Sequence, residues 1–291
     1  MLELNHNQER GFWYRFRRRP RAWVGATIVL GVILLAVFAP VVAPADPLYQ
    51  FRDGLSPIGL PLPPDENFFL GTDHLGRDML SRLLYGARVS LFISLVVSAA
   101  SAAVGTGLGL LAGYFSGLFD SILMRIVDTV LAFPAVLLAL GFGSVLKPSI
   151  TTVFLILLFI GWPYHARIIR GQVLSLKERP FIESARAIGC TDLYIIVRHI
   201  LPFVITVSVV LTTLGVANNI LVESALSFLG VGVPLPDASW GNMIAEGQNR
   251  YRIAPWMILV PTAGIILTTL GFNLLGDAVR DALDPRTSHK V

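Results

Sequence analysis

Histidine and carboxylate side chains that could hold a metal ion stand together in one polar stretch of the chain. His74 follows Asp73 directly and lies four residues before Asp78. Zinc sites favour two histidines four residues apart, or cysteines, and this stretch has neither. We therefore expect no metal site, and we predict that hydrogen bonds between aspartates and arginines brace the stretch.

Motifs that would make the chain an enzyme are absent from the sequence. It has no Gly-x-x-x-x-Gly-Lys-Ser/Thr loop for the phosphates of ATP, and no glycine in it is followed by lysine. It also lacks the Gly-x-Ser-x-Gly motif of hydrolases and the His-Glu-x-x-His motif of metalloproteases. We expect a protein that is not an enzyme and that holds no cofactor of its own.

Polar residues inside apolar segments are a second group of candidates, because charged groups are costly in a bilayer. Asp128 lies about one turn inside an apolar segment, and Arg125 stands three residues before it on the same helical face. We predict an ion pair between the two that orients the helix, with a role in gating as the alternative. Four polar residues of a later segment either line a path for a solute or bond to neighbouring helices; they are Asn218, Asn219, Glu223 and Ser227.

The composition indicates which elements must position these residues. Hydrophobic residues make up 54% of the 291 residues and charged residues only 14%, whereas a soluble domain carries about 25% charged residues. A bilayer core about 30 Å thick needs about 20 helical residues to cross it. Six apolar segments are long enough, at residues 22–42, 89–115, 122–146, 151–168, 203–222 and 256–275. We therefore expect an all-α membrane protein with six transmembrane helices.

Arginines determine the predicted orientation of these helices, since basic residues favour the cytosolic side. Six arginines precede the first segment and the stretch 169–200 is basic near its ends, whereas acids outnumber arginines in the stretch 45–88. Both ends of the chain and the stretch 169–200 are therefore predicted to be cytosolic. Because the arginines gather at the ends of apolar segments, the net charge of +4 does not indicate a nucleic-acid partner.

A stripe of small residues runs along the second apolar segment. Its members recur every four residues and so share one helical face; they are Ser101, Gly105, Gly109, Gly113 and Gly117. Such a face lets another helix approach closely inside a membrane. We predict a packing seam against a core helix of this chain or of a partner subunit, with unspecific packing of a glycine-rich helix as the alternative.

The stretch between the fourth and fifth segments has the pattern of a short helix at the cytosolic surface. Pro180 suits the first turn of a helix, and Glu183 lies near its positively polarised N-terminus. Ser184 and Ala185 give a low-profile surface, and Gly189 can end the helix in a turn. We predict a segment that fits a groove in a soluble partner and transmits its movement to the next transmembrane helix.

This stretch resembles the EAA loop of bacterial ABC importer permeases, in which an acidic and two small residues precede a glycine and a closing Leu-Pro. The residues of the loop are Glu183, Ser184, Ala185, Arg186, Gly189, Asp192, His199, Leu201 and Pro202. Ser184 departs from the pattern by replacing an alanine. His199 replaces an apolar residue, which is typical of the dipeptide/oligopeptide/nickel branch. Residues 70–91, 225–232, 240–243 and 273–285 also resemble the second, C-type, permease subunit of that branch.

The resemblance implies a type I ABC importer permease fold in the inner membrane, with the loop acting as a coupling helix that docks on an ATPase. The implied partners are a related second permease in a heterodimer, two ATP-binding subunits that hold ATP and magnesium, and an extracytoplasmic substrate-binding protein. Among dipeptides, oligopeptides, glutathione and nickel chelates, the breadth of the family favours a peptide.

The predicted parts of the chain are a cytosolic tail (1–21), a first transmembrane helix (22–44), an extracytoplasmic loop (45–88), a permease core (89–285) with the coupling loop (169–202), and a C-terminal tail (286–291).

Two other functions are alternatives to an importer permease. A secondary transporter driven by an ion gradient predicts an internal repeat and paired carboxylates near the middle of the bilayer, and the sequence shows no clear repeat. A membrane scaffold without transport explains the apolar segments but leaves the helix, glycine and Leu-Pro of the loop without a purpose.

Overall fold

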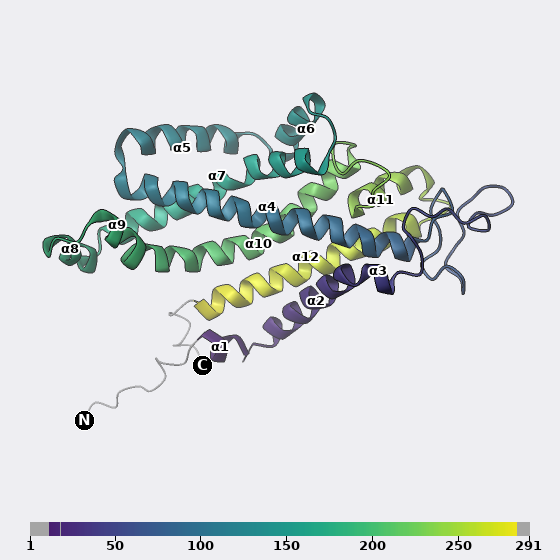
Figure 1. The fold of residues 1–291 in the computed structure, drawn as a ribbon, viewed down its shortest axis with the longest axis horizontal. Helices are drawn as coiled ribbons and strands as arrows, with labels where there is room; N and C mark the ends of the chain where they lie inside the picture. Colours follow the sequence, from purple (N-terminus) through teal and green to yellow (C-terminus); the bar gives the residue numbers. More distant parts are fainter. Residues whose placement is uncertain (1–11, 18, 284–291) are drawn as a thin grey trace.

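The computed structural model describes residues 12–17 and 19–283, and the regular elements in this part are helices, apart from two isolated β-bridges. The helices form an elongated bundle (Figure 1). Most of the predicted cytosolic tail (residues 1–11 and 18) and the predicted C-terminal tail (286–291) lie outside the described residues. The expected all-α membrane fold is confirmed.

Five helices are long and apolar enough to cross a membrane. They are α2 (Pro20–Val37), α4 (Met79–Phe115), α7 (Ile150–Lys177), the stretch ending in α10 (Leu201–Phe228) and α12 (Trp256–Leu283). A bent pair, α5 (Gly117–Ala132) and α6 (Ala135–Val145), supplies the sixth crossing. The short elements are α1 (Phe12–Arg17), α3 (Ala39–Val42), α8 (Pro180–Ala187), α9 (Asp192–Tyr194), a π-helix (Ile195–Ile200), α11 (Trp240–Gly247) and a 3₁₀ turn (Gln248–Arg250).

The third crossing is not the straight helix expected over residues 122–146. Its two halves meet at a bend of 92° between Ala132 and Ala135. Pro134 has no N–H to donate and excludes the helical conformation at the residue before it, and Phe133 accordingly has extended backbone angles. The bend places a break in hydrogen bonding within a transmembrane segment.

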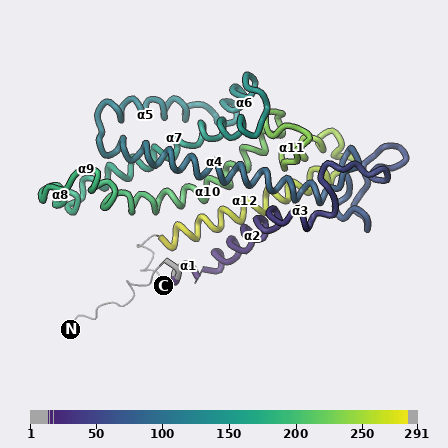
Figure 2. The backbone as a smooth tube through the Cα atoms, viewed as in Figure 1, coloured from purple at the N-terminus to yellow at the C-terminus, as the bar shows by residue number. Residues whose placement is uncertain are grey.

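The two ends of the bundle carry different elements (Figures 1 and 2). One end holds α8, α9, α1 and the last turn of α12, and there an ion pair joins Arg19 to Asp281. The opposite end holds α11 and the long connection between α3 and α4. The first described helix and the last turn of α12 therefore lie at the same end as the predicted coupling loop, as the arginine distribution indicated.

Several helices extend beyond the segments expected from hydrophobicity. The helix α4 begins at Met79 rather than near Val89, because the carboxylate of Asp78 caps it by accepting the backbone N–H of Ser81 at 2.7 Å. The helix α10 continues to Phe228, so Glu223 and Ser227 are helical residues. Helix capping and tertiary packing set these ends, and neither is visible in a hydropathy pattern.

The packing seam of α4 is formed against α7 of the same chain. A Cβ added at Gly109 would lie 2.5 Å from the carbonyl oxygen of Ala166, and one at Gly105 would lie 2.5 Å from Cβ of His165. A Cβ added at Gly113 would lie 2.7 Å from Cβ of Val173, and Ser101 lies against Gly161. Gly117 does not belong to the seam, because α4 ends at Phe115 and Gly117 starts α5 with open space around it.

Replacing Gly109 by alanine is expected to cost about 1–3 kcal/mol, because the new methyl group overlaps backbone that cannot rotate away. Gly107→Ala is the matched control, since a Cβ there has no neighbour within 4 Å. Thermal unfolding of the detergent-purified permease should show a lower midpoint for Gly109→Ala only. Equal midpoints for the two variants would contradict the seam.

Candidate functional site

The helix α8 lies on the cytosolic end of the bundle with one face anchored and the other free. Ile182 and Ala185 are buried against Ile195 and Ile200 of the following π-helix. Glu183 and Ser184 are exposed on the opposite face, and Arg186 is exposed at the edge of the buried face. The sequence pattern places its apolar and polar residues so that the helix can lie flat and present a polar surface.

The end of α8 is a defined turn at Gly189. Its φ of +84° is a conformation that favours glycine. The N–H of Cys190 donates to the carbonyl of Ala185 at 3.0 Å, and the N–H of Gly189 donates to that of Arg186 at 2.9 Å. These two bonds form a Schellman motif, which ends the helix and satisfies its last carbonyls.

Apolar side chains beside this turn have no cover within the described part of the chain. Ile188 is 80% exposed, Leu193 is 72% exposed and Val197 is 52% exposed. Exposed apolar groups gathered next to a polar helix are typical of a protein interface. The segment from Pro180 to Ile200 therefore combines a rigid helix, a fixed turn and an uncovered apolar surface, which we call the coupling surface.

The coupling surface is tied to α4 as well as to α10. The hydroxyl of Tyr114 donates to the carboxylate of Asp192 at 2.5 Å, and the guanidinium of Arg186 lies 5.5 Å from the Tyr114 ring centroid. His199 lies among the rings of Phe181 and Tyr194. Leu201 and Pro202 then begin α10 without an intervening loop. The coupling surface is thus in contact with α4 and continuous with α10.

Most of the polar residues predicted for the translocation path bond within this subunit. Glu223 is fully buried and accepts hydrogen bonds from Ser90 at 3.0 Å and from Ser227 at 2.8 Å. The side-chain amide of Asn219 donates to the hydroxyl of Ser98 at 2.8 Å. Asn218 is exposed. These contacts join α10 to α4, and of the four residues Asn218 alone presents an exposed side chain.

Comparisons with known proteins agree with this geometry. Residues 105–289 match the family of binding-protein-dependent transport system inner membrane components. Residues 8–64 match the N-terminal transmembrane domain of oligopeptide transport permease C. The chain is 43% identical over 276 residues to glutathione transport system permease proteins GsiD of Shigella flexneri serotype 5b and Escherichia coli O157:H7, covering 94% of this chain and 89% of each relative.

The chain belongs to the family of binding-protein-dependent ABC importer permeases. A solved structure of the MetNI methionine ABC transporter, in an inward-facing conformation, has a chain with the same fold at a TM-score of 0.57. That chain is 21% identical, and the match covers 71% of the permease and 98% of that chain. The protein is an inner-membrane permease subunit, as the resemblance of its cytosolic loop indicated.

The permease pairs Asp128 differently from the prediction. Its carboxylate forms an ion pair with Arg167 of α7 and not with Arg125 of its own helix. A second ion pair joins the same helices, where the Arg170 guanidinium donates to Asp120 at 2.6 Å. The spacing of three residues favoured Arg125 as the partner of Asp128. The arginines of α7 reach the carboxylates of α5 instead, because α5 and α7 lie side by side (Figure 1). The pairs hold α5 against the core of the permease.

The extracytoplasmic end of the permease carries a buried charge cluster, which we call the outer network. Asp73 accepts from Nε of Arg77 at 2.6 Å and from Arg82, and Arg82 also donates to Glu246 of α11 at 2.6 Å. The predicted hydrogen bonds between aspartate and arginine are confirmed for Asp73. Asp78 instead caps α4, and the sequence did not indicate the part that Glu246 plays. Glu246 gave no signal because its partners lie more than 160 residues away in the chain.

Electrostatics at the outer network oppose the binding of a metal ion. The ligand atoms of Asp73, His74 and Glu246 lie within 4.8 Å of one another. Burial alone would raise the pKa of Asp73, but the guanidiniums of Arg82 and Arg77 hold it below its usual value. Burial lowers the pKa of His74, against the opposing effect of Glu246 and Asp73. Two arginines already neutralise both carboxylates, so a cation would meet positive charge here.

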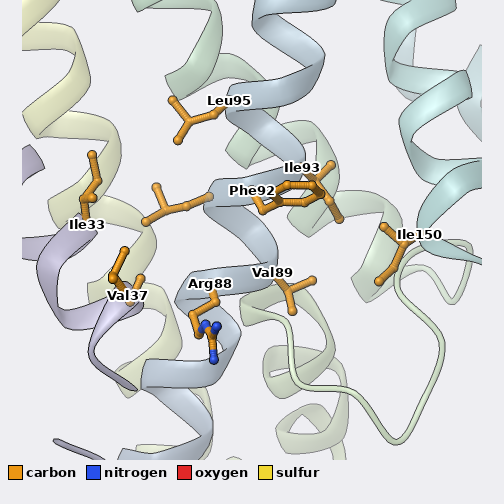
Figure 3. Close-up of a pocket in the computed structure, with 10 residues that line it drawn as sticks. Ile33, Val37, Arg88, Val89, Phe92, Ile93, Leu95 and Ile150 are labelled. Atoms are coloured by element: carbon orange, nitrogen blue, oxygen red, sulfur yellow. The ribbon is translucent and has the colours of Figure 1, made fainter. Parts of the chain in front are cut away.

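An apolar groove of about 440 Å³ lies between α2 and α4, with Ile150 of α7 on its far side (Figure 3). Nine of the ten residues that line it are apolar, and the exception is Arg88. Ile33 and Val37 of α2 lie on one side of it, and Leu95 of α4 extends toward them from the other side. A polar solute would lose its hydrogen bonds to water in such surroundings, so the groove is not a candidate translocation route.

Proposed function

We propose that this permease forms half of the translocation path of an ATP-driven importer of short peptides, including glutathione. Two similarities support the substrate class. The relatives that are 43% identical are named as glutathione transport permeases, and the N-terminal match is to an oligopeptide transport permease. Glutathione is itself a peptide, so both similarities indicate the same class of solute.

The proposed assembly contains a related second permease, two ATP-binding subunits and an extracytoplasmic substrate-binding protein. ATP and magnesium belong to the ATP-binding subunits, because this sequence has no phosphate-binding loop. The solute would be released from the binding protein at the end of the bundle that holds α11 and would leave at the end that holds α8. No cofactor and no metal is assigned to this chain.

The observation that carries the proposal is the coupling surface. It combines exposed polar side chains on α8 with the exposed Ile188 and Leu193 beside the Gly189 turn. Because this surface continues into α10 and contacts α4 through Tyr114, closure of an ATPase dimer beneath it would move both helices. Such movement would open the path alternately to the two sides of the membrane.

The test is ATP-driven uptake by the complete importer in proteoliposomes, with labelled glutathione and alanyl-alanine as probes. Leu193→Glu should abolish uptake and prevent co-purification of the ATP-binding subunits, because a charge would be buried at the interface. Leu118→Glu is the control, since Leu118 is 77% exposed outside the coupling surface. Retention of the ATP-binding subunits by Leu193→Glu would overturn the coupling role, and uptake of neither probe by the native complex would overturn the peptide assignment.

A further inference from the structure

A partly polar cavity of about 430 Å³ lies among α4, α7 and α10, beside the break between α5 and α6. Its volume falls within the range of about 300–1,000 Å³ that is usual for small-molecule sites. His165 lies close to the middle of α7 and Gly215 close to the middle of α10, so the cavity lies about halfway along these two helices. Leu131 and Ala135 line it from either side of the bend. We call it the His165 cavity.

Two polar groups in the wall of the His165 cavity lack partners. Within the described part of the chain, Nε2 of His165 and Oγ of Ser101 are buried and have no hydrogen-bond partner. The two residues are 5% and 1% exposed. A buried polar group without a partner costs about 1–3 kcal/mol. A ligand that forms hydrogen bonds with both groups would remove this cost.

The geometry brings these two groups to one place. Nδ1 of His165 lies 3.4 Å from the carbonyl oxygen of Gly161, and a Cβ added to Gly161 would lie 2.6 Å from Oγ of Ser101. The histidine ring also faces Gly215, whose added Cβ would lie 3.9 Å from Cε1. The missing side chain of Gly161 thus lets the hydroxyl approach α7 closely, and the imidazole lies beside Gly215 of α10.

The chemistry of the wall selects an uncharged polar ligand. A neutral imidazole that donates from Nδ1 to Gly161 has an unprotonated Nε2, which accepts a hydrogen bond. The hydroxyl of Ser101 can donate to a carbonyl. Among the described residues that line the cavity, none is Asp, Glu, Lys or Arg, and the remaining polar groups include the amides of Asn218 and Asn219. A terminal ammonium or carboxylate would find no counter-charge here.

The irregular backbone around the cavity points to the same use. Pro134 breaks the third crossing, and Pro163 lies inside α7 two residues before His165. Pro163, inside a helix, cannot donate to the carbonyl four residues before it. In a membrane such groups are tolerated where they are covered by protein or line a polar cavity. The open side of the cavity lies at Tyr164, which is 54% exposed, and at the exposed Asn218.

We propose that the His165 cavity is a binding station for the uncharged amide group of a peptide during its passage through the permease. Nε2 of His165 accepts the peptide N–H, and Oγ of Ser101 donates to the peptide carbonyl. This inference rests on the proposed peptide function and adds to it the residues that contact the solute and the group that they recognise.

An amide and its ester analogue test the proposal in the complete importer. Alanyl-alanine and alanyl-lactate differ in the N–H that His165 is proposed to bind. The ratio of their ATP-driven uptake rates is measured in proteoliposomes with one saturating binding protein, whose own preference is common to every permease variant. His165→Leu should lower the ratio of amide to ester uptake about tenfold, the effect of one hydrogen bond to a buried group. His165→Gln, which keeps an acceptor, should preserve most of the ratio.

A variant of Ser101 gives a second, independent test, because it should not impair folding. Ser101→Ala removes a hydroxyl that has no partner among the described residues, so the melting temperature should not fall, while uptake of both probes slows and their ratio is unchanged. Thr106→Val is the control, because Thr106 of the same helix bonds to Ser208 at 2.8 Å outside the cavity. Thr106→Val should lower stability without slowing uptake of folded complexes.

The outcomes separate the cavity from the proposed function. If His165→Leu transports both probes with the native ratio, or if Ser101→Ala transports at the native rate, the cavity is not a station for the amide. If the native complex hydrolyses ATP but imports neither probe, the peptide assignment fails and the inference fails with it.

Discussion

Replacing Arg82 by methionine is expected to destabilise the permease by about 3–5 kcal/mol, the usual cost of removing one partner from a buried ion pair. The Arg82 side chain is fully buried and bonds to both Asp73 and Glu246. Without it, Arg77 alone would neutralise the buried Asp73 and the partly buried Glu246. Methionine fills much of the volume of the arginine stem, so the loss reports on charge more than on packing.

Arg88→Met is the matched control for this prediction. Arg88 lies on the same helix, is exposed, and its guanidinium is 5.6 Å from the ring centroid of Tyr85. Thermal unfolding in detergent, followed by tryptophan fluorescence, should show a large drop for Arg82→Met and little change for Arg88→Met. Trp240 and Trp256 both lie near the affected end, where their indole N–H groups donate to backbone carbonyls of Leu83 and Thr72. Equal effects of the two variants would show that the outer network contributes no special stability.

The pH dependence of the native permease gives a further measure of the same network. The pKa of Asp73 is depressed in the folded state, so its contribution to the free energy of unfolding is present above the unfolded pKa of about 3.9 and is lost as pH falls through the lower folded value.

Adding Glu246→Gln to Arg82→Met removes one of the two uncompensated carboxylates. The double variant should therefore recover part of the stability lost in the single variant.

The sequence predicted the transmembrane segments and the coupling loop well because both depend on local patterns. Hydrophobic length marks a membrane crossing, and small residues at a spacing of four mark the seam at Gly105, Gly109 and Gly113. The turn at Gly189 was also predictable, because glycine ends helices more readily than other residues. In each case neighbours in sequence determine the structure.

Features that depend on distant partners were not predictable in the same way. Asp128 was assigned to Arg125 because the two are close in sequence, yet α7 supplies Arg167 instead. The bend at Pro134 was missed because the hydropathy of residues 122–146 is continuous through it. His165 gave no signal of a site in the sequence: its Cβ packs close to Gly105, and its ring lines a cavity that only the assembled helices create.

A second large effect is expected at Gly189, where substitution by glutamate should abolish ATP-driven uptake while leaving the subunit folded. A Cβ at this position meets no atom within 4 Å, so the subunit itself has space for a side chain. The cost within the subunit is limited to the positive φ of +84°, which amounts to about 1–2 kcal/mol for a residue other than glycine. The larger cost arises in the complex, where a charge would be buried against the ATP-binding subunit.

Gly189→Asn separates the conformation of the turn from the shape of the docking surface. Asparagine tolerates positive φ better than other side chains, so this variant keeps the Schellman turn but adds a neutral polar group. If the turn is what matters, Gly189→Asn should retain ATP-binding subunits and uptake, whereas Gly189→Ala should lose part of both. If an uncluttered surface is what matters, Gly189→Ala should be the more active of the two. Normal uptake by Gly189→Glu would exclude both accounts, because neither a strained turn nor a buried charge would then impair coupling between the ATP-binding subunits and α10.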